Sequence, residues 1–163
     1  MPPSDNLLMI ADSEHDANML YAVGMFVPDP FIYLRLRGRD YIVMSDLEID
    51  RARRIALHCR VLSLKRYQEK LRQSGIKSPG LARVVHAILR EKGVGRVLIP
   101  ASFSLGLADE IKSLGVAVNA QRGSFFPQRE LKSSAEVKKI SAALAMAEIG
   151  MAEAMQVLRA SKI

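Results

Sequence analysis

Short apolar runs alternate with amphipathic stretches over most of this chain. The runs have the length and the β-branched and aromatic content of buried strands, whereas the stretches between them repeat their apolar residues at helical spacing. Strands are predicted at residues 7–11, 31–37, 40–44, 60–64, 96–100 and 116–118, with Gly38-Arg39 as a tight hairpin turn. Helices are predicted at residues 45–56, 65–73, 78–92 and 105–114. This order predicts an α/β fold, a mixed β-sheet flanked by helices on both faces.

The predicted starts of two of these helices depend on capping residues. Ser45 or Asp46 is expected to cap the first helix, with Leu47 on its apolar face. Ser78 followed by Pro79 is expected to start the third, because a proline at the first helical position loses no needed hydrogen bond.

The last part of the chain predicts a long helix of a different kind. Ser133 and Glu136 have the spacing of a capping box. The apolar residues that follow repeat at spacings of three and four: Val137, Ile140, Leu144, Ala147, Met151, Met155 and Leu158. This stripe is narrow, as in helices that pair with another helix. We therefore expect the helix either to pair with a copy of itself or to begin a second domain.

Charge is distributed unevenly along the chain, which carries a net charge of +7 over 163 residues. Residues 1–34 contain five acidic residues and no Lys or Arg, whereas residues 35–96 contain sixteen basic and six acidic residues. This pattern suits internal or interdomain complementarity. It lacks the aromatic-studded basic strand or the recognition helix that is typical of nucleic-acid binders, so nucleic acid is not the expected partner.

The sequence shows no targeting segment. Its start lacks a basic n-region, and the apolar run at residues 20–28 is interrupted by Gly24 and shorter than the roughly 20 residues that span a bilayer. Cys59 is the single cysteine, which excludes an intrachain disulfide. We expect a cytoplasmic protein with no membrane partner.

Catalytic and metal-binding motifs are not found in the sequence. It contains no H-E-x-x-H zinc helix, no G-x-S-x-G nucleophile elbow and no P-loop. The three histidines, His15, His58 and His86, form no pair with ligand spacing. His58 beside Cys59 is interpreted as a satisfied imidazole next to a buried thiol. We assign no catalytic residue and no metal ligand to this chain.

Three segments resemble motifs of the creatinase, prolidase and aminopeptidase P family. Residues 18–24 resemble the Tyr-x-x-Gly turn near the start of that family's N-terminal domain, with Asn18, Tyr21 and Gly24 at the matching positions. Residues 45–52 lie where the family has a strand-to-helix turn. Residues 128–137 resemble its domain junction, Arg-x-Ile-Lys-Ser-x-x-Glu-Ile. The matching positions there are Arg129, Lys132, Ser133 and Glu136, and Leu131 replaces the usual isoleucine.

The resemblance covers essentially the whole chain and implies two parts. Residues 1–128 would be the family's N-terminal α/β domain, and residues 129–163 the junction and the first helix of a catalytic domain. In that family the catalytic domain has a pita-bread fold and holds two divalent metal ions, Mn, Co or Zn, on two Asp, one His and two Glu. No residue of this chain matches those ligands. The resemblance therefore implies an inactive, non-catalytic piece of a longer protein.

The function implied by the resemblance is that of a domain in a metal-dependent Xaa-Pro dipeptidase or aminopeptidase. It would contribute to substrate access and to contacts with its own catalytic domain and with a second subunit in a homodimer. A prolidase, an aminopeptidase P, a creatinase-like hydrolase and an inactive homologue are all compatible. Two roles are open for the junction residues Arg129, Lys132 and Glu136. They would be surface charges and a helix cap, or they would fix the angle between the two domains.

Two other functions are compatible with the residues. One is a stand-alone α/β interaction module that associates with itself through the C-terminal helix. The other is a nucleic-acid binder that uses the basic patch of residues 35–96.

Overall fold

The structure, a computed structural model, describes residues 6–161. It divides into two units, the first ending at Phe125 and the second beginning at Phe126. We call residues 6–125 the sheet unit and residues 126–161 the helical unit, and describe each by itself. The expected domain boundary after Gln128 stays a prediction.

A six-stranded sheet forms the centre of the sheet unit, in the order β4-β3-β2-β1-β5-β6. Pairing is antiparallel between β1 and β2 and between β2 and β3, and parallel between the other neighbours. The strands are β1 (Leu7–Ala11), β2 (Phe31–Leu36), β3 (Arg39–Met44), β4 (Arg60–Ser63), β5 (Arg96–Ile99) and β6 (Ala117–Ala120). The predicted mixed sheet is confirmed.

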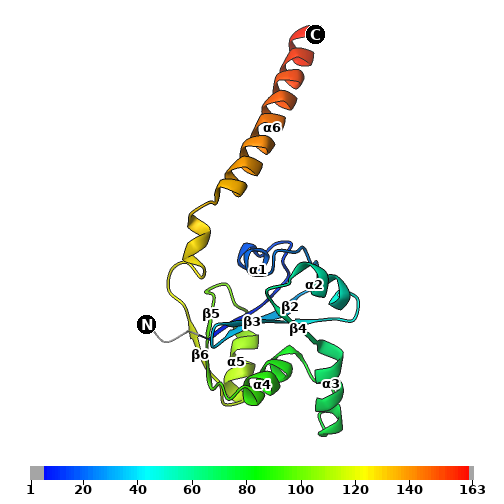
Figure 1. The fold of residues 1–163 in the computed structure, drawn as a ribbon, viewed down its shortest axis with the longest axis vertical. Helices are drawn as coiled ribbons and strands as arrows, with labels where there is room; N and C mark the ends of the chain where they lie inside the picture. The colour runs from blue at the N-terminus through cyan, green and yellow to red at the C-terminus, as the bar shows by residue number, and fades with distance from the viewer. Residues whose placement is uncertain (1–5, 162–163) are drawn as a thin grey trace. The chain divides into compact units, whose positions relative to one another are not determined.

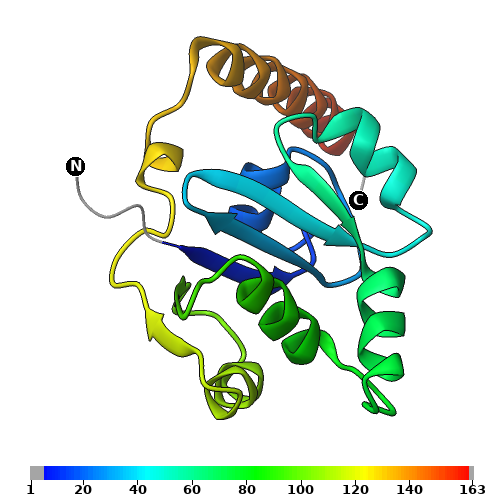
Figure 2. The same cartoon turned by 60° about the horizontal axis from the view of Figure 1, so that its bottom comes forward.

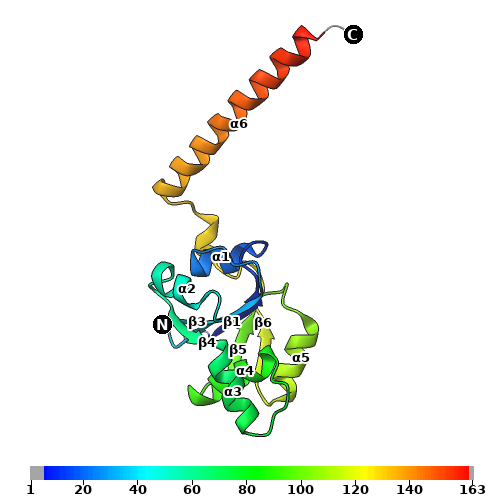
Figure 3. The ribbon, with the colours of Figure 1, turned by 90° about the vertical axis from the view of Figure 1, so that its right-hand side faces the viewer.

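Helices cover both faces of the sheet, as Figures 1 and 3 show. One face carries α1 (Ala17–Val23) and α2 (Ile49–Ile55), and the other carries α3 (Leu64–Gln73), α4 (Leu81–Glu91) and α5 (Leu105–Ser113). Successive side chains of a strand point to opposite faces, so one strand contributes buried side chains to both faces of the sheet. Leu8 belongs to the core under α4 and α5, and its neighbours Leu7 and Met9 are buried outside that cluster. The α/β fold with helices on both faces follows from this alternation.

The hairpin between β2 and β3 is confirmed, with its turn one residue earlier than predicted (Figure 2). Leu36 pairs with Arg39, so the two turn residues are Arg37 and Gly38. Both have positive φ, 51° and 75°. Two successive positive φ values are typical of a type I′ turn, whose twist matches that of the flanking strands.

Two helix starts differ from the prediction. After β3 the chain makes a turn before α2, whose N-cap is Glu48 and makes no side-chain cap hydrogen bond. Ser45 contributes only its backbone oxygen, which accepts from the N–H of Ile49 at 3.0 Å, and Leu47 is 89% exposed. Neither Ser45 nor Asp46 is therefore the cap, because the helical backbone begins only after the turn.

The start of α4 also lies further along the chain than expected. The residue that precedes the helix is Gly80, which has extended backbone dihedrals of −75° and 176°. Ser78 and Pro79 therefore lie before the helix and do not start it. The apolar face predicted for this helix is confirmed, because Val84, Val85 and Ile88 are fully buried.

The helical unit consists of the short 3-10 helix η1 (Pro127–Glu130) and α6 (Ser134–Ala160). With 27 residues, α6 is the predicted long helix, and at 1.5 Å per residue it is about 40 Å long. Figure 1 draws it in orange to red as one uninterrupted helix. Its apolar side chains are exposed, Ile140 at 53% and Leu144 at 58%.

By length and composition alone, α6 could cross a membrane. Its mean hydropathy reaches 1.2, and within the described residues it is the one helix that meets this criterion. Glu148 and Glu153 lie inside it, and carboxylates in a bilayer centre are costly. The expectation of no membrane partner was based on the absence of long uninterrupted apolar runs, and it stays a prediction.

Candidate functional site

The first predicted motif, Asn18, Tyr21 and Gly24, lies on α1 and at its C-terminal end. Asp16 caps the helix, since its Oδ1 accepts from the backbone N–H groups of Asn18 and Met19 at 2.8 Å each. Gly24 ends it in the left-handed conformation, with φ 70°. Its N–H donates to the oxygen of Leu20 at 2.8 Å. Glycine is favoured at such a helix end, so the role of Gly24 in the motif is conformational.

The two side chains of this motif lie three residues apart on α1. Tyr21 is 45% exposed and Asn18 is half-buried. Met19, Ala22 and Val23 are the buried residues of the helix. Among the described residues, no group of three or more His, Cys, Asp and Glu side chains that could hold a metal ion lies near them or elsewhere. Their assignment as a functional motif stays a prediction.

Ser13, which the sequence analysis did not single out, holds the loop around α1 together. Its side chain is fully buried. The Oγ–H donates to the oxygen of Met25 at 2.7 Å, and Oγ accepts from the N–H of Val27 at 2.8 Å. The N–H of Ser13 donates to the oxygen of Val27 at 3.0 Å. Nothing in the sequence pattern marks this serine, because its partners are backbone groups 12 and 14 residues away.

The second predicted motif lies in the helical unit and contains a confirmed capping box. Ser133 Oγ accepts from the N–H of Glu136 at 3.3 Å, and Glu136 Oε2 accepts from the N–H of Ser133 at 2.8 Å. The Ser133 hydroxyl also donates to that oxygen at 2.7 Å. Lys132 Nζ donates to the backbone oxygen of Arg129. Arg129, Lys132, Ser133 and Glu136 therefore form a local structure at the start of α6, and a role at a domain junction stays a prediction.

Hydrogen bonds lower the pKa of two carboxylates, one exposed and one half-buried. The side-chain and backbone hydrogen bonds from Ser133 lower the pKa of Glu136. The backbone hydrogen bond from His15 lowers the pKa of Asp12, whose Oδ1 lies 2.7 Å from that N–H. In both cases a carboxylate accepts backbone N–H groups that a turn or a helix start leaves free. These shifts describe local structure and not a catalytic acid or base.

His58 and Cys59 do not face a common site. The imidazole Nε2 of His58 donates to the oxygen of Ala22 at 2.8 Å. Cys59 is buried, and desolvation raises the pKa of its thiol to about 12. A thiol with so high a pKa is not a nucleophile at neutral pH.

A metal site is not formed by the described residues. Within residues 6–161, no group of three or more His, Cys, Asp and Glu side chains could hold a metal ion. The ligand set of a two-metal peptidase does not fit onto this part of the chain.

No family model matches the sequence, and no curated protein matches it. Solved structures are similar to it. The X-Pro aminopeptidase of Thermotoga maritima superposes with a TM-score of 0.72 at 16% identity, over 93% of this chain and 40% of that chain. The prolidase of Pyrococcus horikoshii gives a TM-score of 0.69 at 18% identity, over 93% of this chain and 38% of that chain.

A third structure shows which part of such proteins is similar. It is the N-terminal domain of the cytoplasmic peptidase PepQ from Mycobacterium tuberculosis, with a TM-score of 0.50 and 15% identity, over 74% of this chain and 82% of that chain. The chain thus spans about two fifths of the length of the aminopeptidase and of the prolidase, but most of that single domain. The fold is that of the N-terminal part of Xaa-Pro peptidases, as the sequence resemblance predicted.

Proposed function

We propose that this chain is the non-catalytic N-terminal domain of a metal-dependent Xaa-Pro dipeptidase or aminopeptidase. The observation that carries the proposal is the fold. It matches 93% of this chain to about two fifths of an X-Pro aminopeptidase and of a prolidase. The described residues contain no group that could hold a metal ion. Hydrolysis would therefore belong to a metal-bearing domain, in which metal ions activate water and polarise the scissile carbonyl.

In this proposal the sheet unit shapes access to the catalytic domain, and α6 is the first helix of that domain and packs against the rest of it. The exposed apolar stripe of α6 supports this second role, because side chains such as Ile140 and Leu144 have surface to bury. The capping box of Ser133 and Glu136 fixes where the helix starts. Arg129 and Lys132 would set the angle between the domains. A cytoplasmic homodimer with Mn, Co or Zn in its catalytic domain is the complete form that we propose.

The test compares this chain with the full product of its gene. We expect the pure 163-residue chain to show no hydrolysis of an Xaa-Pro dipeptide with added Mn²⁺ or Zn²⁺, and a longer product with downstream Asp, Asp, His, Glu and Glu ligands to show EDTA-sensitive hydrolysis. Metal-dependent turnover by the pure 163-residue chain would contradict the proposal. So would a gene product that lacks such a ligand set.

A stand-alone module that associates through α6 is the second candidate, and the same exposed stripe favours it. Sedimentation separates the two. A tight dimer that is lost when Leu144 and Met151 are changed to glutamate supports the module. A monomer in the micromolar range supports the peptidase domain, whose helix would be covered by the catalytic domain.

A further inference from the structure

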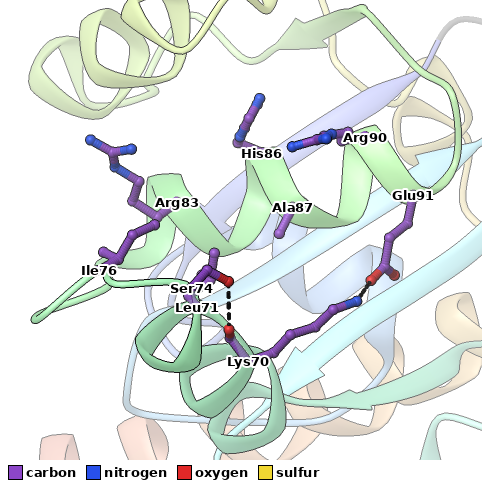
Figure 4. A pocket seen from close by; sticks show the side chains of 9 residues that line it. All are labelled: Lys70, Leu71, Ser74, Ile76, Arg83, His86, Ala87, Arg90 and Glu91. Carbon is purple, nitrogen blue, oxygen red and sulfur yellow. Dashed lines mark hydrogen bonds and ion pairs between the residues drawn. The ribbon is translucent and has the colours of Figure 1, made fainter.

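A groove between α3 and α4 is lined by two arginines, Arg83 and Arg90, that form no ion pair among the described residues. It has a volume of about 560 Å³ and is lined by residues of both helices and the turn between them (Figure 4). Arg83, His86 and Arg90 project from one side of α4. Arg90 lies seven positions after Arg83, so their Cα atoms lie about 10 Å apart along the helix.

The one carboxylate in the groove is already neutralised. Glu91 accepts from Lys70 Nζ at 2.5 Å and from the hydroxyl of Tyr67 at 2.8 Å. The hydrogen bond from Lys70 lowers the pKa of Glu91, so the acid stays ionised and paired at neutral pH. Within residues 6–161, neither Arg83 nor Arg90 has a carboxylate within ion-pair distance. Both guanidinium groups are therefore available to an acidic ligand.

Three of the residues that line the groove are apolar. Leu71, Ile76 and Ala87 line it and are each half-buried, and Ala87 lies on the α4 surface between the arginines and α3. A second hollow of about 530 Å³ shares Lys70 and Glu91 with the first and adds the exposed Arg66. The combined surface offers an apolar track with cations along its sides.

We infer that this groove binds an acidic amphipathic helix of a partner protein. Leucine-like side chains of that helix would lie on Leu71, Ile76 and Ala87, while its carboxylates pair with Arg83 and Arg90. This inference is independent of the proposed peptidase function. It is favoured over a nucleic acid because Tyr67 is the one Phe, Tyr or Trp among the residues that line the two hollows, whereas single-stranded nucleic acids stack successive bases on several aromatic side chains.

The experiment measures fluorescence anisotropy of the full chain with a labelled 16-residue helical peptide that carries leucines at spacings of three and four and glutamates elsewhere. A scrambled peptide of the same composition and a 20-nucleotide oligothymidylate are the comparison probes. At physiological salt we expect Arg83→Glu with Arg90→Glu to weaken peptide binding about tenfold or more. The double variant Arg39→Glu with Arg54→Glu changes net charge equally outside the groove and should weaken binding less than about twofold.

Ala87→Lys separates docking in the groove from simple charge attraction. It adds a positive charge but fills the apolar track, so we expect it to weaken peptide binding about fivefold or more. Tighter binding by this variant, equal binding of the scrambled peptide, or an equal loss in the control double variant would overturn the inference. Oligothymidylate binding tighter than the peptide and sensitive to the Arg83 and Arg90 changes would overturn it in favour of a nucleic acid. Circular dichroism confirms that each variant is folded.

Discussion

The sheet unit and the helical unit use the same apolar periodicity in opposite ways. On α4, Ile88 and Leu89 are fully buried, whereas on α6, Leu144 is 58% and Met151 66% exposed. Both helices repeat apolar residues at spacings of three and four. Periodicity thus predicts that a helix has an apolar face, but not what covers that face. The covered face stabilises the sheet unit, and the exposed face on α6 is available to a partner.

The largest expected difference between the two faces is in the cost of truncating a leucine. Leu89→Ala should lower the free energy of unfolding of the sheet unit by about 2–5 kcal/mol, since it removes buried methyl groups and leaves a cavity. Leu144→Ala, the matched change on α6, should lower it by less than about 0.5 kcal/mol. Tyrosine fluorescence in urea measures this unit alone, because all four tyrosines lie at or before residue 67. Equal losses would show that the comparison of the two faces is wrong.

Burial separates two serines of the sheet unit in the same way, since Ser13 is buried and Ser113 is exposed. Ser13→Ala would leave the N–H of Val27 and the oxygen of Met25 without their buried hydroxyl partner. We expect a loss of about 1–3 kcal/mol in the unfolding free energy of the sheet unit. Ser113→Ala removes a hydroxyl that donates to Glu110 on an exposed surface, and should cost less than about 0.5 kcal/mol. A loss for Ser13→Ala as small as that of the control would contradict the role of this serine.

These examples show what the sequence could predict. The hairpin, the buried face of α4 and the capping box depend on neighbours within about seven residues, and each is confirmed. The predicted start of α2 was wrong. A turn after β3 leaves Leu47 exposed to solvent, so this side chain does not belong to the apolar face of the helix. Ser13 was missed because its partners lie on another loop segment.

Two of the three segments that carry the resemblance differ in how much defined structure they contain. The junction motif is a defined local structure in which Ser133 and Glu136 bond reciprocally. The turn motif is a helix end at Gly24 with one exposed tyrosine. Neither brings catalytic chemistry to the described residues, so the proposed function rests on the fold as a whole and not on a site.

The capping box is expected to have a smaller effect, confined to the helical unit. Ser133→Ala removes the oxygen that accepts from the N–H of Glu136, and should destabilise the first turn of α6 by about 1 kcal/mol. Ser134→Ala, at the next position, removes no cap and is the control. Hydrogen exchange of the first turn should become faster in the first variant and not in the second. Faster exchange in both variants would mean that the loss of either serine destabilises the first turn, and that the cap has no specific role.

The smallest expected effect is the pH response of the same turn. The pKa of Glu136 is lowered from its ordinary value of 4.5 by the hydrogen bonds from Ser133. A carboxylate whose pKa is lowered in the folded state stabilises that state above the ordinary pKa, and the stabilisation is lost as the pH falls through the lowered value. We therefore expect the amide resonances of Ser133 and Glu136 to shift together in an NMR titration, with a midpoint below pH 4.5. In Glu136→Gln, which keeps a neutral acceptor for the same N–H, this joint shift should disappear. A midpoint at or above the ordinary value would mean that the reciprocal bonds are not formed in solution, and α6 would then begin, like α2, without a side-chain cap.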